Sequence, residues 1–382
     1  MDNLTHSLVG LASAKAGLDR LSPYATAVCV VSANIADADF VTLFFGDRWT
    51  LLQHHRGLTH SIVGTISIGL LVPLIAFAIE RVVVRLRRQS ARIRFRGLLL
   101  ASMIAAVTHP LLDWTNNYGV RPLLPWNGRW FYGDLVFIFD PYIWLALGGV
   151  VFLLTSRTRL QMLLWAALGL VLATFIGLAG WRSGPDGAAL RIAFVVWMIA
   201  IAGLMGLRAF GVQRKAGRAI AAAALVLLAG YWGGLVWAHH SALANTLSVA
   251  NQAQLMGGER VVQIAAMPTV ATPFQWQSVV ETDVAIYRFK VPIGSDSSGV
   301  SEISAFNRYP KPTGQSAQLV SLAERDRRVQ ALLSFARFPL GRVEADNCVG
   351  QALVQFADLR YTEPGAPRGN FSVNVPVDCP AR

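Results

Sequence analysis

Long apolar runs alternate with short polar or basic stretches over the first 240 residues of this chain. A helix needs roughly 17–25 mostly apolar residues to cross the hydrocarbon core of a bilayer. The pattern therefore predicts a mainly α-helical, polytopic membrane bundle in residues 1–240. The clearest predicted spans are 61–79, 97–112, 135–154, 160–180, 188–206 and 219–238.

Two shorter apolar segments, 4–18 and 24–45, precede these spans, and Asp37 and Asp39 interrupt the second segment. One interpretation is a helical hairpin that enters from the outer face and turns near Lys15. The alternative is a re-entrant or interfacial hairpin. The sequence does not decide between the two.

Charged residues make up only 15% of the chain, and its mean hydropathy is +0.44, whereas soluble domains average about 25% charged residues. The formal charge of +12 comes largely from basic loops beside apolar runs, which favours a role in membrane orientation and lipid contact over nucleic-acid binding. The positive-inside rule places the loops 81–96, 155–159 and 207–218 in the cytoplasm. The loops 113–134 and 181–187 and the tail from residue 241 are then expected outside, in an inner-membrane protein.

The tail, residues 241–382, has a different pattern and is predicted to be an extracytoplasmic, β-rich (α+β) domain. Residues 261–265, 278–289 and 371–375 alternate apolar and polar positions, as half-buried strands do. A helix is expected within 316–338. This domain could engage a protein partner.

The chain contains three cysteines. Cys348 and Cys379 lie in the tail and could form a disulfide in an oxidising compartment if their strands are neighbours, which the sequence leaves open. Cys29 lies in an apolar segment and is expected to contribute only packing.

Imidazole and carboxylate side chains are concentrated in the first third of the chain. Two hexapeptides, Thr5-His-Ser-Leu-Val-Gly10 and Thr59-His-Ser-Ile-Val-Gly64, are nearly identical. The third Thr-His pair is Thr108-His109, and Asp113 follows His109 by one helical turn on the same face. Thr5 and Thr59 are expected to be helix N-caps that fix the direction of the histidine beside each.

Asp37-Ala-Asp39 and His54-His55-Arg56 add further ionisable groups. Such groups are costly inside apolar segments and persist there mainly where they have a function. Asp37 and Asp39 are two residues apart and cannot share a helix face, so one carboxylate is expected to be a ligand and the other to support it. A His/Asp set without cysteine suits zinc, or manganese and iron.

Polar and aromatic residues follow Asp113 and have two interpretations. They could form the wall of a substrate cleft at the bilayer surface, or an interfacial aromatic belt. Arg56 likewise could neutralise an anionic oxygen or anchor the chain to lipid, and Asp140 is expected to begin the next helix. The residues concerned in the loop are Asn116, Asn117, Tyr118, Gly119, Trp126, Arg129, Tyr132 and Asp134.

Several of these motifs together resemble the membrane-bound metal-dependent hydrolases, also described as LexA-binding, inner-membrane-associated hydrolases. The resemblance covers roughly residues 1–145. That family is thought to be distantly similar to zinc-dependent phospholipase C and P1-type nuclease. The motifs are Asp2-x-x-Thr-His6-Ser, Asp37-x-Asp39, His55-Arg-Gly-x-Thr-His60-Ser and His109-x-x-x-Asp113-x-x-x-Asn-x-Gly119, continued by Pro125–Asp134 and Phe139-Asp140-Pro.

The resemblance implies a helical hydrolase that uses a divalent metal, with zinc as the first candidate. The chain has no obvious further His-x-x-x-Glu, so one or two ions are expected rather than three. Association with LexA would need a cytoplasmic surface, and these residues give it no support. The ligands carried over are His6, Asp39 or Asp37, His55, His60, His109 and Asp113, and the catalytic candidates are Asp37, Asp39, Asp113 and Arg56.

The resulting hypothesis is an integral membrane hydrolase that cleaves a phosphoester of a lipid or envelope precursor at the outer interface. Metal-activated water would attack while one of the carboxylates orients it or takes its proton. One alternative is a non-catalytic metal-binding protein whose tail engages a partner. A transporter is the other, less supported because the candidate ligands all lie before residue 140.

Overall fold

The computed structural model describes residues 1–252, 257–293, 307–344, 350–366 and 370–379. These residues form two compact units. The first unit is Met1–Ala38, Arg56–Val236 and Thr269–Pro273, and the second is Asp39–His55, Trp237–Pro268 and Phe274–Arg382. Residues 39–55, which lie within the predicted helical domain 1–240, thus cluster with the tail.

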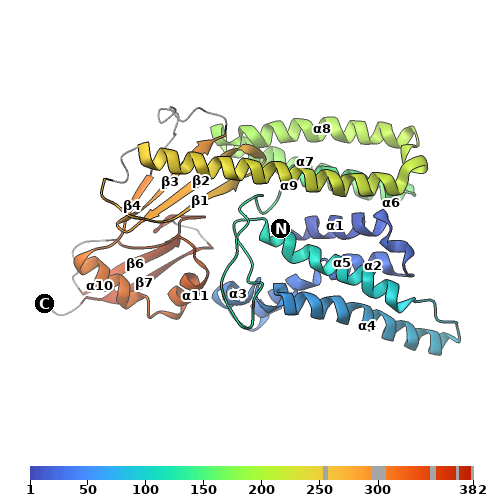
Figure 1. The fold of residues 1–382 in the computed structure, drawn as a ribbon, viewed down its shortest axis with the longest axis horizontal. Helices are drawn as coiled ribbons and strands as arrows, with labels where there is room; N and C mark the ends of the chain where they lie inside the picture. The colour runs from blue at the N-terminus through green and yellow to red at the C-terminus, as the bar shows by residue number, and fades with distance from the viewer. Residues whose placement is uncertain (253–256, 294–306, 345–349, 367–369, 380–382) are drawn as a thin grey trace. The chain divides into compact units, whose positions relative to one another are not determined.

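The first unit is a bundle of helices (Figure 1). Helix α1 contacts α2, α5 and α6, α4 pairs with α5, and α7 pairs with α8. These helices are α1 (Asn3–Ala16), α2 (Ala25–Ser32), α4 (Ile62–Arg87), α5 (Phe95–Trp114), α6 (Pro141–Thr155), α7 (Arg159–Arg182), α8 (Ala188–Ala209) and α9 (Val212–Gln252), the last of which continues into the second unit.

The predicted spans are confirmed, with one exception. Among the described residues, α4, α5, α7, α8 and α9 are long and apolar enough to cross a membrane, so the chain is a multi-pass membrane protein by length and composition. The predicted span 135–154 is wrong at its start, because the helix begins only at Pro141 and has 15 residues. The Asp140 carboxylate accepts hydrogen bonds from the Tyr142 and Ile143 N–H groups and fixes this start.

The N-terminal hairpin is helical on both sides. Helix α1 packs on α2, and the 3₁₀-helix η1 (Leu18–Arg20) lies at the turn between them. Helix α2 is followed by a second 3₁₀-helix, η2 (Ile35–Phe44), at a bend of 51°. The pair is either a broken span or a re-entrant loop, so the two interpretations of this segment both remain.

Among the described residues, the second unit contains two antiparallel sheets, three short α-helices and the end of α9. The sheets have strand orders β1-β2-β3-β4 and β5-β6-β7, which confirms a β-rich α+β tail. The strands are β1 (Val261–Thr269), β2 (Thr272–Thr282), β3 (Ala285–Pro292), β4 (Asn307–Pro310), β5 (Pro339–Val343), β6 (Gln351–Asp358) and β7 (Ser372–Asp378). Helix α3 (Arg48–His54) packs on α11 (Arg327–Phe335), and Arg327 forms a 2.8 Å ion pair with Asp47.

Two predicted elements in the tail are each divided by a turn. Residues 278–289 are not one strand, because β2 and β3 pair in a hairpin that turns at Asp283 and Val284. The helix predicted within 316–338 is two helices, α10 (Gly314–Ala323) and α11, and the Asp326 carboxylate caps the second by accepting from the Arg328 N–H.

Cys348, the predicted partner of Cys379, lies outside the described residues, and Cys29 is a buried free thiol.

The last residue of each repeated hexapeptide is a glycine at a close backbone approach. A Cβ atom on Gly64 would lie 2.0 Å from the Leu58 carbonyl oxygen, and one on Gly10 would lie 3.0 Å from the Cys29 carbonyl oxygen. Side chains are therefore excluded at Gly64 and poorly tolerated at Gly10. The repeat thus combines a histidine with a glycine that lets the chain pass close to a neighbouring segment.

Candidate metal centre

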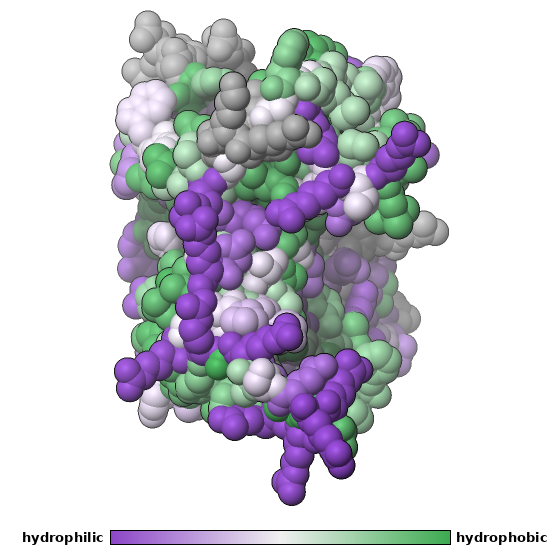
Figure 2. All heavy atoms as spheres, turned by 90° about the vertical axis from the view of Figure 1, so that its right-hand side faces the viewer, coloured by the Kyte–Doolittle hydropathy of each residue, from purple (hydrophilic) through white to green (hydrophobic). Residues whose placement is uncertain are grey.

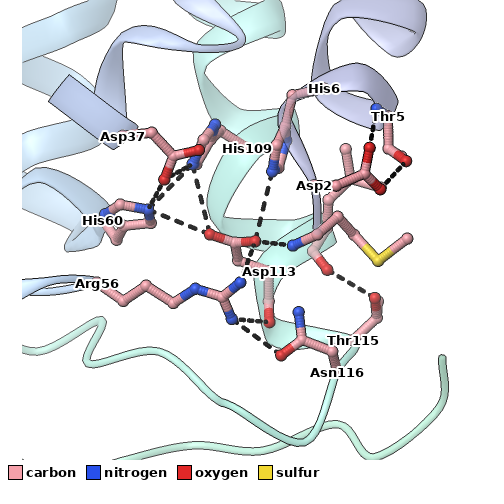
Figure 3. Close-up of polar contacts among 12 residues, drawn as sticks. Asp2, Thr5, His6, Asp37, Arg56, His60, His109, Asp113, Thr115 and Asn116 are labelled. Carbon is pink, nitrogen blue, oxygen red and sulfur yellow. Dashed lines mark hydrogen bonds and ion pairs between the residues drawn. The ribbon is translucent and has the colours of Figure 1, made fainter. Parts of the chain in front are cut away.

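Four segments of the first unit bring imidazole and carboxylate groups together (Figure 3). His6 lies on α1, and Asp37 lies at the start of η2, just after the bend that follows α2. His60 ends the 3₁₀-helix η3 (Leu58–His60), directly before α4. His109 and Asp113 lie one turn apart on α5 and are both fully buried.

The ligand atoms of these side chains lie within a narrow range of distances. His60 Nε2 is 3.1 Å from Asp113 Oδ2 and 3.3 Å from Asp37 Oδ1. His109 Nε2 is 3.4 Å from Asp113 Oδ2 and 3.5 Å from Asp37 Oδ1. The two histidine Nε2 atoms are 3.0 Å apart. Because tetrahedral zinc ligands at 2.0–2.1 Å from the ion lie about 3.3 Å from one another, these spacings fit one divalent ion.

The Nδ1 atoms of His109 and His60 make contacts that orient the two rings toward the cluster. His109 Nδ1 lies 2.7 Å from the Ala33 carbonyl oxygen, to which it can only donate, and His60 Nδ1 lies 2.9 Å from the Thr59 hydroxyl. In the neutral imidazole of His109 the proton is therefore on Nδ1, and Nε2 presents a lone pair to the cluster. A backbone carbonyl behind a metal-binding histidine is a common arrangement that orients the ring.

His6 completes one side of the cluster. Its ring stacks on the His109 ring with centroids 3.8 Å apart, and its Nε2 lies 3.4 Å from Asp113 Oδ1. Among the described residues, neither ring nitrogen of this fully buried histidine makes a hydrogen bond. A buried polar atom without such a bond costs free energy, so the position suits a histidine that binds a cation.

Arg56 holds Asp113 from the opposite side. Its Nη2 lies 2.9 Å from Asp113 Oδ1, and its Nη1 donates to the Asp113 carbonyl, the Asn116 side chain and the Gly119 carbonyl at 2.9–3.3 Å. The guanidinium also lies over the Tyr118 ring at 4.6 Å. The amino group of Met1 contacts the same carboxylate. Arg56 is only 2% exposed, so it binds the interior of the protein rather than lipid headgroups.

Asp39 and His55, two further predicted ligands, lie in the second unit. His55 Nδ1 is 2.9 Å from Asp39 Oδ1, both residues are buried, and the Phe40 ring packs on the imidazole. They form a pair at the two ends of the segment 39–55. Their predicted roles as ligand and catalytic group stay predictions.

The predicted helix caps at Thr5 and Thr59 are wrong. Asp2 caps α1, with its carboxylate accepting from the Thr5 N–H at 3.0 Å and from the Thr5 hydroxyl at 2.7 Å. Ser61 caps α4 by accepting from the Gly64 N–H. Asp2 lies three residues before Thr5 and Ser61 two residues after Thr59, so each helix begins at a different residue from the one expected.

The loop after Asp113 combines buried supports with an exposed tip. Asn116 is fully buried and accepts from both Arg56 and the Tyr118 N–H. Trp126 is 79% exposed, and Val120 and Phe131 form a short β-bridge. The first part of the loop therefore supports the cluster, while its tip is free to contact lipid or substrate.

Some residues of the site carried no sequence signal that identified their role. The Ala33 carbonyl acts through the main chain, and any residue could have supplied it. Asp2 stands in a motif, but its contact with the Trp144 indole N–H at 3.1 Å joins residues 142 positions apart. Only the packing of α1 on α6 brings these two together.

Comparison with known proteins shows what the helical part of the chain is similar to. Residues 1–183 match the YdjM inner membrane protein family. The uncharacterized protein YfhP of Bacillus subtilis (strain 168) is 25% identical over 377 residues, which cover 96% of this chain and 88% of that protein. No solved structure matches the chain. The predicted similarity to zinc-dependent phospholipase C and P1-type nuclease stays a prediction. The region that holds the whole His/Asp cluster is therefore similar to the YdjM inner membrane protein family, in agreement with the resemblance of its motifs.

Proposed function

We propose that this protein is a divalent-metal hydrolase of the inner membrane that cleaves a phosphoester in a membrane lipid or lipid-linked envelope precursor. The observation that carries the proposal is the convergence of Asp37, His60, His109 and Asp113, with four buried ligand atoms at metal-binding spacings. His6 is the fifth candidate ligand. A set of neutral imidazoles and carboxylates without a thiolate is typical of catalytic rather than structural zinc.

When bound, a zinc ion or a related divalent ion supplies Lewis-acid chemistry that makes water reactive near neutral pH. The chain's own side chains supply the rest. His109, oriented by the Ala33 carbonyl, presents a nitrogen lone pair, and the Thr59 hydroxyl holds the ring of His60 beside it. Asp37 is the candidate proton acceptor for the attacking water, because among the described residues no arginine contacts its carboxylate, whereas Arg56 contacts that of Asp113. Arg56 holds Asp113 in place as a positioning residue.

A groove on the bundle favours a lipid substrate over a soluble one. It has a volume of about 320 Å³, lies between α4 and α5, and is lined by apolar side chains apart from Thr65 and the ring of His60. Ile62, Val107 and Leu111 in its walls are each more than 40% exposed, as is usual for side chains that face lipid. An acyl or prenyl chain in this groove would bring the attached phosphoester toward His60.

The test is hydrolysis by the purified full chain in lipid nanodiscs. We expect release of a labelled headgroup from phospholipid, loss of this activity on treatment with a chelator, and its return on addition of Zn²⁺. His54→Ala is the matched control, because His54 is exposed and bonds only the Thr50 carbonyl among the described contacts. Metal binding without turnover of any phosphoester would instead favour a non-catalytic metal protein.

The groove makes a separate prediction about substrate class. Leu111→Trp should fill the groove and lower turnover of long-chain phospholipid about tenfold, since an added ring overpacks a site of this size. The same variant should hydrolyse a small soluble phosphodiester as fast as the wild type. Leu74→Trp, on an exposed position of α4 that does not line the groove, is the control. Equal loss on both substrates would argue against the groove as the lipid site.

A further inference from the structure

A second cavity of the first unit is lined by basic side chains from four separate parts of the sequence. Its volume is about 470 Å³. The lining comes from the α1–η1 turn, the end of α6, the end of α8 and the start of α9. The residues are Lys15, Asp19, Arg20, Leu153, Leu154, Arg157, Arg208, Gly217 and Arg218.

The charges of this cavity do not balance. Five basic residues and one acidic residue line it, and the acidic one, Asp19, already forms a 3.1 Å ion pair with Lys15. Arginine side chains that converge on one concave site repel one another unless an anion is present. Phosphate groups are well matched to such a site, because a guanidinium can bind two phosphate oxygens at once.

The cavity lies at the basic end of the bundle. The Arg94 N–H donates to Ser22 at 3.0 Å and its side chain contacts the Arg20 carbonyl, which brings the α4–α5 loop to the same end. Figure 2 looks onto this end, where hydrophilic side chains gather around apolar helix surfaces. The positive-inside rule assigns this end to the cytoplasmic leaflet.

The apolar part of the lining distinguishes a lipid from a free anion. Leu153 and Leu154 form a wall beside the arginines. Phe210, in the turn between α8 and α9, is 85% exposed, which suits a side chain in contact with hydrocarbon. A soluble phosphate would leave the half-buried Leu154 and the exposed Phe210 uncovered, whereas the glycerol and first carbons of a phospholipid would cover them.

We propose that this cavity binds the headgroup phosphate of an anionic phospholipid. Basic pockets between transmembrane helices on the cytoplasmic side are known to bind such headgroups. The site is separate from the His/Asp cluster, shares no residue with it, and does not depend on the proposed hydrolase activity. It would anchor α1, α6, α8 and α9 to one another through the lipid.

The experiment measures binding of phosphatidylglycerol and phosphatidylcholine to the delipidated full chain in non-ionic detergent. The test variant is Arg157→Gln with Arg218→Gln, which removes two exposed pocket charges. The control is Arg85→Gln with Arg87→Gln, which removes two exposed charges from the end of α4, outside the pocket. We expect the pocket variant to bind phosphatidylglycerol about tenfold more weakly or worse, since each basic residue contributes on the order of 1 kcal/mol, and the control to stay within about twofold.

Three outcomes would overturn the proposal. The first is equal weakening in the control, which would show general surface electrostatics. The second is equal binding of the two lipids by the wild type. The third is displacement of phosphatidylglycerol by an equal concentration of inorganic phosphate, which would assign the pocket to a soluble anion. Unchanged melting temperatures of both variants in detergent would show that neither change acts through misfolding.

Discussion

His109→Ala is expected to remove the bound metal and, with it, all phosphoester hydrolysis. The imidazole contributes an Nε2 within 3.5 Å of His60, Asp37 and Asp113. Its loss opens the cluster and also leaves the buried Ala33 carbonyl without its donor. Changes in residues that only hydrogen-bond to metal ligands typically lower metal affinity about 10–100-fold, so we expect a loss of more than about 100-fold for this ligand.

Asp113→Asn separates the charge of the ligand from its shape. The amide keeps the volume of the carboxylate but cannot neutralise a cation, so metal content should fall as in His109→Ala. Because the change also leaves the buried Arg56 guanidinium without its carboxylate partner, the melting temperature of the variant is measured beside its metal content. Metal per protein, measured by mass spectrometry of the purified variants, checks both changes against His54→Ala. If either variant keeps full metal content, the ion is bound elsewhere and the proposed ligand set is wrong.

Arg56→Met is expected to be the most destabilising single change near the cluster. It would leave the fully buried Asp113 carboxylate without its arginine partner, and it would remove one donor from each of three further acceptors. Removing one partner of a buried ion pair typically costs about 3–5 kcal/mol. The melting temperature of the purified protein in detergent should therefore fall clearly below that of Arg129→Met, which alters an exposed arginine in the same region.

Arg56→Lys tests whether the arginine acts by charge alone. Lysine keeps the positive charge but cannot reach the four oxygen atoms that the guanidinium contacts. We expect a folded protein that retains metal, with a lower kcat and an unchanged KM because Asp113 is less well positioned. A wild-type kcat in Arg56→Lys would show that only the charge of Arg56 matters. A wild-type melting temperature in Arg56→Met would show that Arg56 does not hold Asp113 in place.

The sequence was a good guide to the helices and to which residues approach one another in the first unit. Apolar runs predicted α4, α5, α7, α8 and α9, since a lipid-facing helix must be apolar over its whole length. The i, i+4 spacing of His109 and Asp113 predicted one shared face of α5. The repeated Thr-His-Ser hexapeptides predicted that His6 and His60 play related parts, and both now lie beside Asp113.

Local hydrogen bonds decided what the sequence could not. Asp326 starts a new helix inside a predicted one by capping it. The helix start at Asp140, by contrast, was expected from the sequence and is confirmed. The two-residue spacing of Asp37 and Asp39 predicted that the two carboxylates have different partners, but it did not predict which partners these are. Asp37 contacts His60 and His109, whereas Asp39 pairs with His55 in the segment that clusters with the tail.

Long-range contacts of the main chain were also beyond prediction. The Ala33 carbonyl orients His109, and the Leu58 carbonyl requires glycine at position 64. Any residue type has such a carbonyl, so the identities of Ala33 and Leu58 gave no sign of these contacts. The cavity lined by four arginines and one lysine is a similar case, because its residues lie in separate parts of the sequence that look like ordinary membrane-flanking charges.

X-ray absorption spectroscopy of the zinc-loaded full chain tests the central claim most directly. The account predicts only nitrogen and oxygen ligands at about 2.0–2.1 Å, with outer-shell scattering from two or three imidazole rings that is lost in His60→Ala and His109→Ala. A spectrum with sulfur ligands, or one that is the same in the wild type and in both variants, would show that the His/Asp cluster is not the metal site.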